Sequence, residues 1–180
     1  MRFIDLFAGL GGFHIALSKL GHECVFASEI KPALTKLYEE NFGLKPHGDI
    51  KAVKVEDIPE HDILCAGFPC QPFSKAGRQR GLQDETNGNL FNEIVRVLDF
   101  HKPQYFILEN VQHLAKHDNE ETYNHISSIL RKLGYDVKGE VLSPHDFNIP
   151  QHRQRLFIVG CRHGLNNFSW PEKRELTRNA

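Results

Sequence analysis

Short apolar runs alternate along the chain with longer stretches whose apolar residues recur every three or four positions. The runs predict buried strands, at Arg2–Phe7, Cys24–Ser28, Asp62–Ala66 and Tyr105–Leu108, with a weaker one near Pro46–Asp49. The periodic stretches predict amphipathic helices around residues 13–20, 34–42, 90–98 and 126–133. Three of these stretches are followed by a glycine, as helix ends commonly are: Gly21, Gly43 and Gly134.

Two further strands are expected at Tyr135–Leu142 and Arg155–Gly160. The connection between them is too short for a crossover helix, so they are predicted to pair antiparallel. Asp118 and Glu121 have the spacing of a capping box before the last helix. The order of elements predicts a doubly wound α/β domain with a mostly parallel sheet and one antiparallel strand.

The residues most unusual for a structural scaffold come directly after predicted strands. They lie in Phe7–Gly12, Ser28-Glu29, Gly48-Asp49, Gly67–Ser74 and Glu109-Asn110. Ligands of doubly wound sheets bind beyond the carboxyl ends of the strands, so these segments are expected to form one site.

Gly9, Gly11 and Gly12 separate the first strand from the first helix. Glycines let backbone approach a ligand at a helix N-terminus, and Glu29, about twenty residues further on, is placed to accept hydrogen bonds from ribose hydroxyls. The pattern favours a nucleotide-like cofactor. The alternative is a tight turn and a solvated carboxylate, and the missing third glycine of GxGxxG argues against an ordinary dinucleotide site.

Cys70 lies between two prolines, Pro69 and Pro72, in the segment GFPCQPFS. The prolines stiffen the backbone around the thiol, and a nucleophile needs such placement together with thiolate character. Arg153 and Arg155 would lower the thiol pKa if the last hairpin folds beside this segment. A buried structural cysteine is the alternative, and the prolines and the strand-end location favour the nucleophile.

The composition limits which partners the chain is expected to bind. The 180 residues carry a net charge of −1, so affinity for nucleic acid has to come from local clusters, at Lys75–Arg80 and His152–Arg155. The four cysteines and eleven histidines show no metal-binding spacing, so no metal is expected and the histidines are interpreted as mostly exposed or hydrogen-bonded. No apolar run reaches membrane-spanning length and no signal-peptide pattern opens the chain, so a cytoplasmic protein without membrane contacts is expected.

Four segments in order resemble the motifs of the C5-cytosine DNA methyltransferase family of bacterial restriction–modification type. They are FIDLFAGLGGF (Phe3–Phe13), GFPCQPFS (Gly67–Ser74), ENV (Glu109–Val111) and QHRQR (Gln151–Arg155). The resemblance covers essentially the whole chain. It implies a Rossmann-like, S-adenosylmethionine-dependent methyltransferase fold and a DNA (cytosine-5-)-methyltransferase activity.

The resemblance also assigns residues to the cofactor, S-adenosylmethionine, which leaves as S-adenosylhomocysteine. Phe7 and Ile30 would flank the adenine, Glu29 would hold the ribose, and Asp49 would bind the adenine amino group. The remaining cofactor-binding residues would be Gly9, Leu10, Gly11, Gly12, Ile50, Gly67, Pro69 and Leu90.

The implied chemistry begins with addition of the Cys70 thiolate to C6 of cytosine, which makes C5 nucleophilic. Glu109 would stabilise charge on the ring, Arg155 would hold the cytosine O2, and Arg153 would support phosphate or loop geometry. After methylation at C5, a base that the sequence does not identify would remove the C5 proton, and the thiolate would leave.

The target cytosine has to be flipped out of duplex DNA. The polar, glycine-containing loop Lys75–Gly88 is predicted to close over the DNA and to be mobile without it. The resemblance assigns DNA contacts to Gln71, Ser74, Lys75, Arg78, Arg80 and Asn110.

Family members normally continue into a target-recognition domain. We therefore expect residues 1–171 to form an incomplete catalytic and cofactor-binding domain, residues 172–180 to form a polar tail, and the target-recognition domain to be absent. On this interpretation the isolated chain has little or no activity, and a complementary chain would carry DNA recognition. An inactive cofactor-binding fragment is the main alternative; a Rossmann oxidoreductase is the weaker one, because it leaves Cys70, Glu109 and the arginines without a role.

Overall fold

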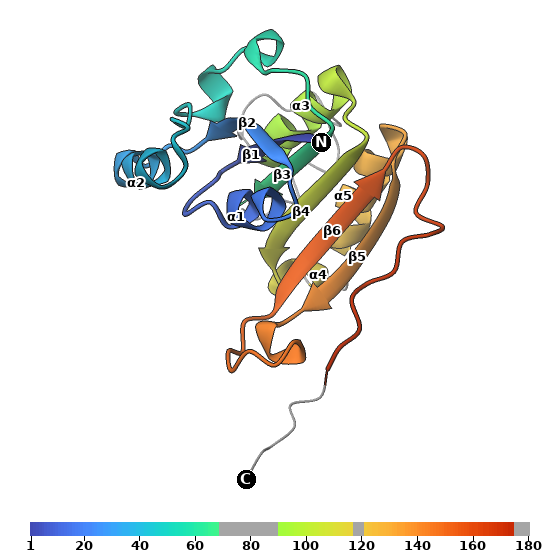
Figure 1. The fold of residues 1–180 in the computed structure, drawn as a ribbon. Helices are drawn as coiled ribbons and strands as arrows, with labels where there is room; N and C mark the ends of the chain where they lie inside the picture. The colour runs from blue at the N-terminus through green and yellow to red at the C-terminus, as the bar shows by residue number, and fades with distance from the viewer. Residues whose placement is uncertain (69–89, 117–120, 175–180) are drawn as a thin grey trace. The chain divides into compact units, whose positions relative to one another are not determined.

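A computed structural model describes residues 1–68, 90–116 and 121–174 of the chain. Within it, backbone contacts divide the protein into two compact units, Met1–Leu108 and Glu109–Ala180 (Figure 1). The strands are hydrogen-bonded in the order β2-β1-β3-β4-β6-β5. This six-stranded, mostly parallel sheet with one antiparallel pair confirms the predicted α/β class.

The first unit contains the glycine turn. Its elements are β1 (Arg2–Leu6), α1 (Gly12–Ser18), β2 (Glu23–Ser28), α2 (Pro32–Phe42), the 3-10 turns η1 (Ile50–Ala52) and η2 (Val55–Asp57), β3 (Ile63–Gly67), α3 (Leu90–His101) and the start of β4 (Tyr105–Val111).

Strand β1 lies between β2 and β3 and is parallel to both. Its residues Phe3–Leu6 are all buried, as expected of a parallel strand covered on both faces. In the register, Leu6 is opposite Ser28 of β2 and Ala66 of β3. The three strands therefore end at the same level, and the segments after them leave the sheet at one edge.

The second unit contains the end of β4, α4 (His113–Lys116), α5 (Glu121–Lys132), β5 (Asp136–Leu142), the 3-10 turn η5 (Pro144–Asp146) and β6 (Arg155–Cys161). Strands β5 and β6 pair antiparallel over their whole length, which confirms the sequence prediction. Helix α4 was not predicted. The proposed capping residue Asp118 lies outside the described residues.

The predicted strand at Pro46–Asp49 is wrong. Only His47 forms a bridge there, parallel to Ser28, and no strand results. Pro46 has no N–H to continue a ladder. Strand β4 also continues through Glu109 and Asn110 to Val111, so these two residues lie within the strand rather than after it.

Candidate functional site

The turn after β1 has an unusual backbone. Phe7, Gly9 and Gly11 all have positive φ, of 56°, 56° and 79°. A Cβ at Gly11 would lie 2.3 Å from the ring of Phe42 in α2, closer than side chains can approach. Glycine at this position is therefore required both by the backbone conformation and by the packing of the turn on α2.

Glu29 holds this turn in place. Its carboxylate is 8% exposed; Oε2 accepts the N–H of Gly9 at 2.9 Å, and Oε1 accepts the N–H of Lys31 at 2.8 Å. A carboxylate has about four lone-pair sites, so each oxygen keeps capacity for another donor. This remaining acceptor capacity suits the predicted role of accepting hydrogen bonds from ribose hydroxyls, and the structure adds a second role in fixing the turn.

The segment around Asp49 lies beside the end of β2. The His47 backbone accepts a hydrogen bond from the N–H of Glu29 and donates one to Ala27, both at 2.8 Å. Asp49 caps η1 by accepting the N–H of Lys51 at 3.0 Å. Two segments predicted to bind the cofactor are thus hydrogen-bonded neighbours.

The apolar residues assigned to the cofactor differ in exposure. Leu10 and Ile30 are each 65% exposed, which leaves apolar side chains on the glycine turn and after β2, whereas Ile50 is 2% exposed. Gly67 ends β3 and Leu90 begins α3; both are partly buried.

A buried polar network behind the turn was not predicted. Asp5 of β1 is 1% exposed, and the Tyr38 hydroxyl lies 3.4 Å from its Oδ2. The Tyr38 hydroxyl also lies 2.7 Å from Nδ1 of His14 and 3.7 Å from Sγ of Cys24. Burial raises the pKa of Asp5 to about 8, so its carboxyl is largely protonated at neutral pH. The sequence signal was the single acid inside the apolar run RFIDLF.

His61 and His101 are each hydrogen-bonded through one ring nitrogen, to the carbonyls of Pro59 and Val55 at 2.8 Å. His61 and His101 are buried with ring centroids 5.0 Å apart, and His61 Nε2 and His101 Nδ1 have no hydrogen-bond partner among the described residues. Burial, followed by the neighbouring His101, lowers the pKa of His61.

The second unit brings Glu109 and Arg155 together. Nε of Arg155 in β6 lies 2.8 Å from Oε1 of Glu109 in β4, and the two side chains are 22% and 27% exposed. Arg155 also donates from one terminal nitrogen to the carbonyl of Gln154 at 2.8 Å. The structure thus places the acid of ENV beside the second arginine of QHRQR, and the roles assigned to both residues stay predictions.

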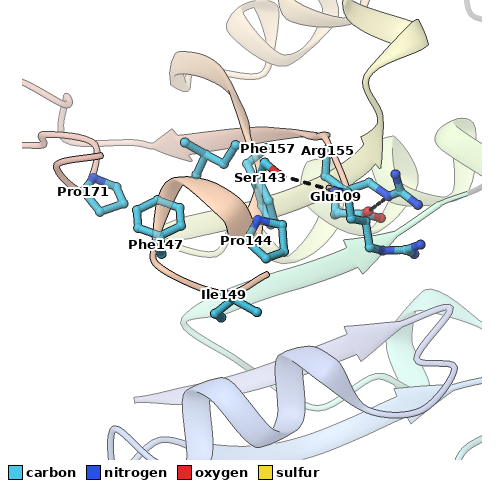
Figure 2. Close-up of a pocket in the computed structure, with 10 residues that line it drawn as sticks. Glu109, Ser143, Pro144, Phe147, Ile149, Arg155, Phe157 and Pro171 are labelled. Carbon is cyan, nitrogen blue, oxygen red and sulfur yellow. Dashed lines mark hydrogen bonds and ion pairs between the residues drawn. The ribbon is translucent and has the colours of Figure 1, made fainter. Parts of the chain in front are cut away.

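This ion pair lies at a cavity of about 420 Å³ (Figure 2). The cavity is lined by Glu109, Leu142, Ser143, Pro144, Phe147, Ile149, Arg153, Arg155, Phe157 and Pro171. Most of these residues are apolar, and the three charged ones are those that the sequence assigned to catalysis. Such a lining suits an apolar or planar group that makes polar contacts at one side.

Several predicted site residues lie outside the described residues, and their placement stays a prediction. They are Pro69, Cys70, Gln71, Ser74, Lys75, Arg78 and Arg80, together with the Lys75–Gly88 loop. Asn110 is described; it is 2% exposed, and its Oδ1 accepts the N–H of Val111 at 2.8 Å.

In the described part of the chain, no three His, Cys, Asp or Glu residues form a group that could hold a metal ion. No helix of this part has the length and apolar character needed to cross a membrane.

A mostly parallel sheet with a glycine turn after its first strand and a buried acid after its second is typical of nucleotide-binding α/β proteins. A family model for C-5 cytosine-specific DNA methylases matches residues 1–179. The chain belongs to this family, as the four motifs indicated.

Named relatives agree with this assignment. The chain is 47% identical to the type II methyltransferase M.DsaV of Dactylococcopsis salina over an alignment of 180 positions that covers 98% of this chain and 51% of that protein. It is 46% identical to the type II methyltransferase M.HhaI of Haemophilus parahaemolyticus over 178 residues, 98% of this chain and 54% of that protein. The chain thus spans about half the length of the curated relatives it matches.

Solved structures show the same fold. The crystal structure of the S. pombe Dnmt2 methyltransferase superposes with a TM-score of 0.72 at 29% identity, over 95% of this chain and 51% of that one.

Proposed function

We propose that this chain supplies the cofactor-binding and catalytic part of a DNA (cytosine-5-)-methyltransferase. The observation that carries the proposal is the Glu109–Arg155 ion pair at the cavity of the second unit, in a chain that belongs to the C-5 cytosine-specific DNA methylase family. An acid and a guanidinium at the side of a mostly apolar cavity suit a planar base with ring nitrogens and a carbonyl oxygen.

The cofactor would be S-adenosylmethionine, which supplies the methyl group when bound. The glycine turn would bring backbone N–H groups close to it, and the remaining lone pairs of Glu29 would accept hydrogen bonds from its ribose hydroxyls. Asp49 would contact the adenine amino group, and the exposed side chain of Ile30 would cover one adenine face.

The chain's own residues would carry the chemistry on cytosine. The Cys70 thiolate forms a bond to C6, and electron density moves toward C5 and N3. Glu109 stabilises the ring at N3, and Arg155 holds O2. C5 then takes the methyl group, and S-adenosylhomocysteine leaves. When the C5 proton passes to a base, its bonding electrons reform the C5–C6 double bond, the C6–S bond breaks and the thiolate is restored.

Duplex DNA would be the substrate, with the cytosine flipped from the stack at a cost of a few kcal/mol. The basic residues Lys75, Arg78 and Arg80 would contact the backbone of the DNA. Because the chain spans only about half of its relatives, recognition of the target sequence would need residues beyond those that match here.

Covalent trapping tests the proposal. A duplex oligonucleotide with 5-fluorocytosine at candidate targets blocks loss of the C5 substituent, so an active thiol stays bound to C6. We expect an adduct that requires S-adenosylmethionine and disappears in Cys70→Ser, measured with and without a candidate chain carrying a target-recognition domain. If no adduct forms with or without the second chain, although calorimetry shows S-adenosylmethionine binding, the proposed catalysis is wrong. The chain would then be a cofactor-binding protein that does not methylate DNA.

A further inference from the structure

The connection between β5 and β6 is organised by one buried side chain. Ser143 is 5% exposed and begins the 3-10 turn η5. Its N–H donates to Oδ2 of Asp146 at 3.1 Å, and the N–H of Asp146 donates to the Ser143 carbonyl at 2.9 Å. These reciprocal bonds close the turn, as a capping box does at a helix start.

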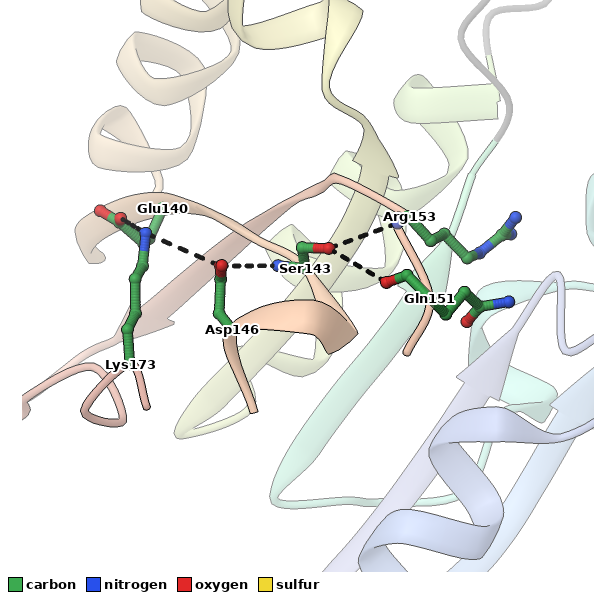
Figure 3. A network of polar contacts seen from close by, with 6 residues as sticks. All are labelled: Glu140, Ser143, Asp146, Gln151, Arg153 and Lys173. Carbon is green, nitrogen blue, oxygen red and sulfur yellow. Dashed lines mark hydrogen bonds and ion pairs between the residues drawn. The ribbon is translucent and has the colours of Figure 1, made fainter. Parts of the chain in front are cut away.

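The Ser143 hydroxyl also reaches across to the arginine segment (Figure 3). Its Oγ accepts the N–H of Arg153 at 3.3 Å and donates to the carbonyl of Gln151 at 3.4 Å. That carbonyl accepts a second bond, from the N–H of His145 at 3.1 Å. The side chains of Gln151 and Arg153 are exposed, and besides these hydrogen bonds the segment is held by stacking of the His152 ring on His145, with centroids 4.2 Å apart.

The same turn holds the tail that follows β6. The N–H of Arg174 donates to the carbonyl of Asp146 at 2.7 Å, and Arg174 forms a parallel bridge with Phe147. Nζ of Lys173 lies 3.4 Å from Glu140 and 3.9 Å from Asp146. Exposed pairs at these distances contribute little, so the backbone bond of Arg174 is the stronger attachment.

Pro171 of this tail lines the same cavity as Arg153 and Arg155. We propose that the Ser143–Asp146 turn is a positioning element that couples the tail, residues 171–174, to the backbone of Arg153. Ser143 and Asp146 touch no reacting atom in this scheme. They act through Arg153, so the effect on catalysis rests on the function proposed above.

This coupling connects the tail to the arginine segment through the Ser143–Asp146 turn. A hydrogen bond to Oγ fixes the Arg153 backbone two residues before Arg155, and the turn that supplies it also accepts the N–H of Arg174 in the tail. Polypeptide attached beyond the tail would therefore influence the arginine segment through two consecutive hydrogen-bonded contacts. In the relatives, about half of the protein lies outside the part that matches this chain.

Hydrogen exchange of the Arg153 amide, measured by NMR on the full chain, tests the positioning directly. Ser143→Ala removes Oγ, and we expect exchange at Arg153 to rise about tenfold, the effect of losing one hydrogen bond of ordinary strength. Ser143→Thr keeps the hydroxyl and should restore slow exchange. Unchanged exchange in Ser143→Ala would overturn the proposal.

Arg174→Pro tests the coupling to the tail, because proline has no N–H to donate to Asp146. We expect a severalfold rise in exchange at Arg153, whereas Lys173→Ala, which removes only the exposed ion pairs, should change it less than about twofold. If Arg174→Pro leaves the Arg153 amide unaffected, the tail is not coupled and the proposal fails. Retained S-adenosylmethionine binding and unchanged amide shifts of β5 show that the variants are folded.

Trapping with 5-fluorocytosine DNA separates this proposal from the proposed function. If the wild-type chain traps DNA, Ser143→Ala should lower the trapping rate and Ser143→Thr should restore it. If the wild-type chain never traps DNA, the proposed function fails, while the exchange measurements still decide whether the turn positions Arg153.

Discussion

Nε of Arg155 and Oε1 of Glu109 are 2.8 Å apart and join neighbouring strands at the cavity of the second unit. Both side chains are about one quarter exposed, so the pair contributes little to stability after solvent screening. Its geometry matters for another reason. Each partner orients the other, and both keep unused donors or acceptors, which in the proposed function would contact a bound base.

Replacing either partner should therefore reduce reactivity far more than stability. We expect Glu109→Gln and Arg155→Lys to lower the rate of 5-fluorocytosine trapping by about a hundredfold or more, with a change in unfolding free energy of about 1 kcal/mol or less. Glu93→Gln is a matched control, because Glu93 pairs with Arg96 at the same 2.8 Å within α3. Equal losses of trapping in Glu93→Gln and Glu109→Gln would contradict a specific role for Glu109.

Glu29 fixes the glycine turn and, in the proposed function, also binds the cofactor, so its substitution tests both roles. Glu29→Gln replaces one accepting oxygen with an amide donor opposite the N–H of Gly9 or Lys31. We expect S-adenosylmethionine affinity in calorimetry to fall about tenfold to a hundredfold. Glu40→Gln, which affects only an exposed pair with Lys36 in α2, should bind as the wild type does. Unaltered affinity in Glu29→Gln would exclude Glu29 from the cofactor site.

Gly11 and Gly12 are adjacent, but replacing them with alanine should change the free energy of unfolding in opposite directions. Gly11→Ala places a Cβ against the Phe42 ring at a φ of 79°, and we expect a loss of about 2–4 kcal/mol of unfolding free energy. Gly12→Ala meets no atom within 4 Å at the start of α1, where alanine is favoured by about 0.5–1 kcal/mol. Urea unfolding of both variants measures the difference. Similar stabilities would show that the turn does not pack on α2 as described.

Because Asp5 is buried, we expect the free energy of unfolding to fall as the pH rises between the two pKa values of its carboxyl. Its pKa is about 8 in the folded protein and 3.8 ordinarily, because burial penalises the charged form. The folded state thus binds the proton more tightly. The stabilisation is complete below pH 3.8, declines as the pH rises from there to about 8, and is absent above that pH. In Asp5→Asn, a neutral side chain of the same shape, we expect the decline of stability between about pH 4 and 8 to become shallower.

The buried side chain of His61 changes stability with pH in the opposite direction to Asp5. The opposite signs allow the two contributions to be separated. Burial lowers its pKa below 6.5, so the unfolded chain takes up the proton first, and stability falls as the pH drops below 6.5. Asp5→Asn should leave this acid limb in place. If Asp5→Asn left the decline of stability between about pH 4 and 8 unchanged, Asp5 would not be its origin.

The sequence by itself determined most of the stretches that form helices and strands, because these stretches follow an apolar pattern. It also determined the motifs that interrupt this pattern. The strands around Phe3–Leu6 and Ile63–Gly67 and the stripe of α3 are recognisable because burial requires consecutive or periodic apolar residues, and this requirement is local. The same holds for the antiparallel β5–β6 pair, whose short connection permits no other topology.

The tertiary structure alone decided which polar groups meet. Nothing local reveals that Glu29 accepts the N–H of Gly9, that Asp5 is buried against Tyr38, or that Ser143 holds the backbone of Arg153. It also decided that His47 forms one bridge instead of a strand. Apolar periodicity records only whether a position is buried, whereas a hydrogen bond depends on the position of a partner distant in the chain, and that position exists only once the protein is folded.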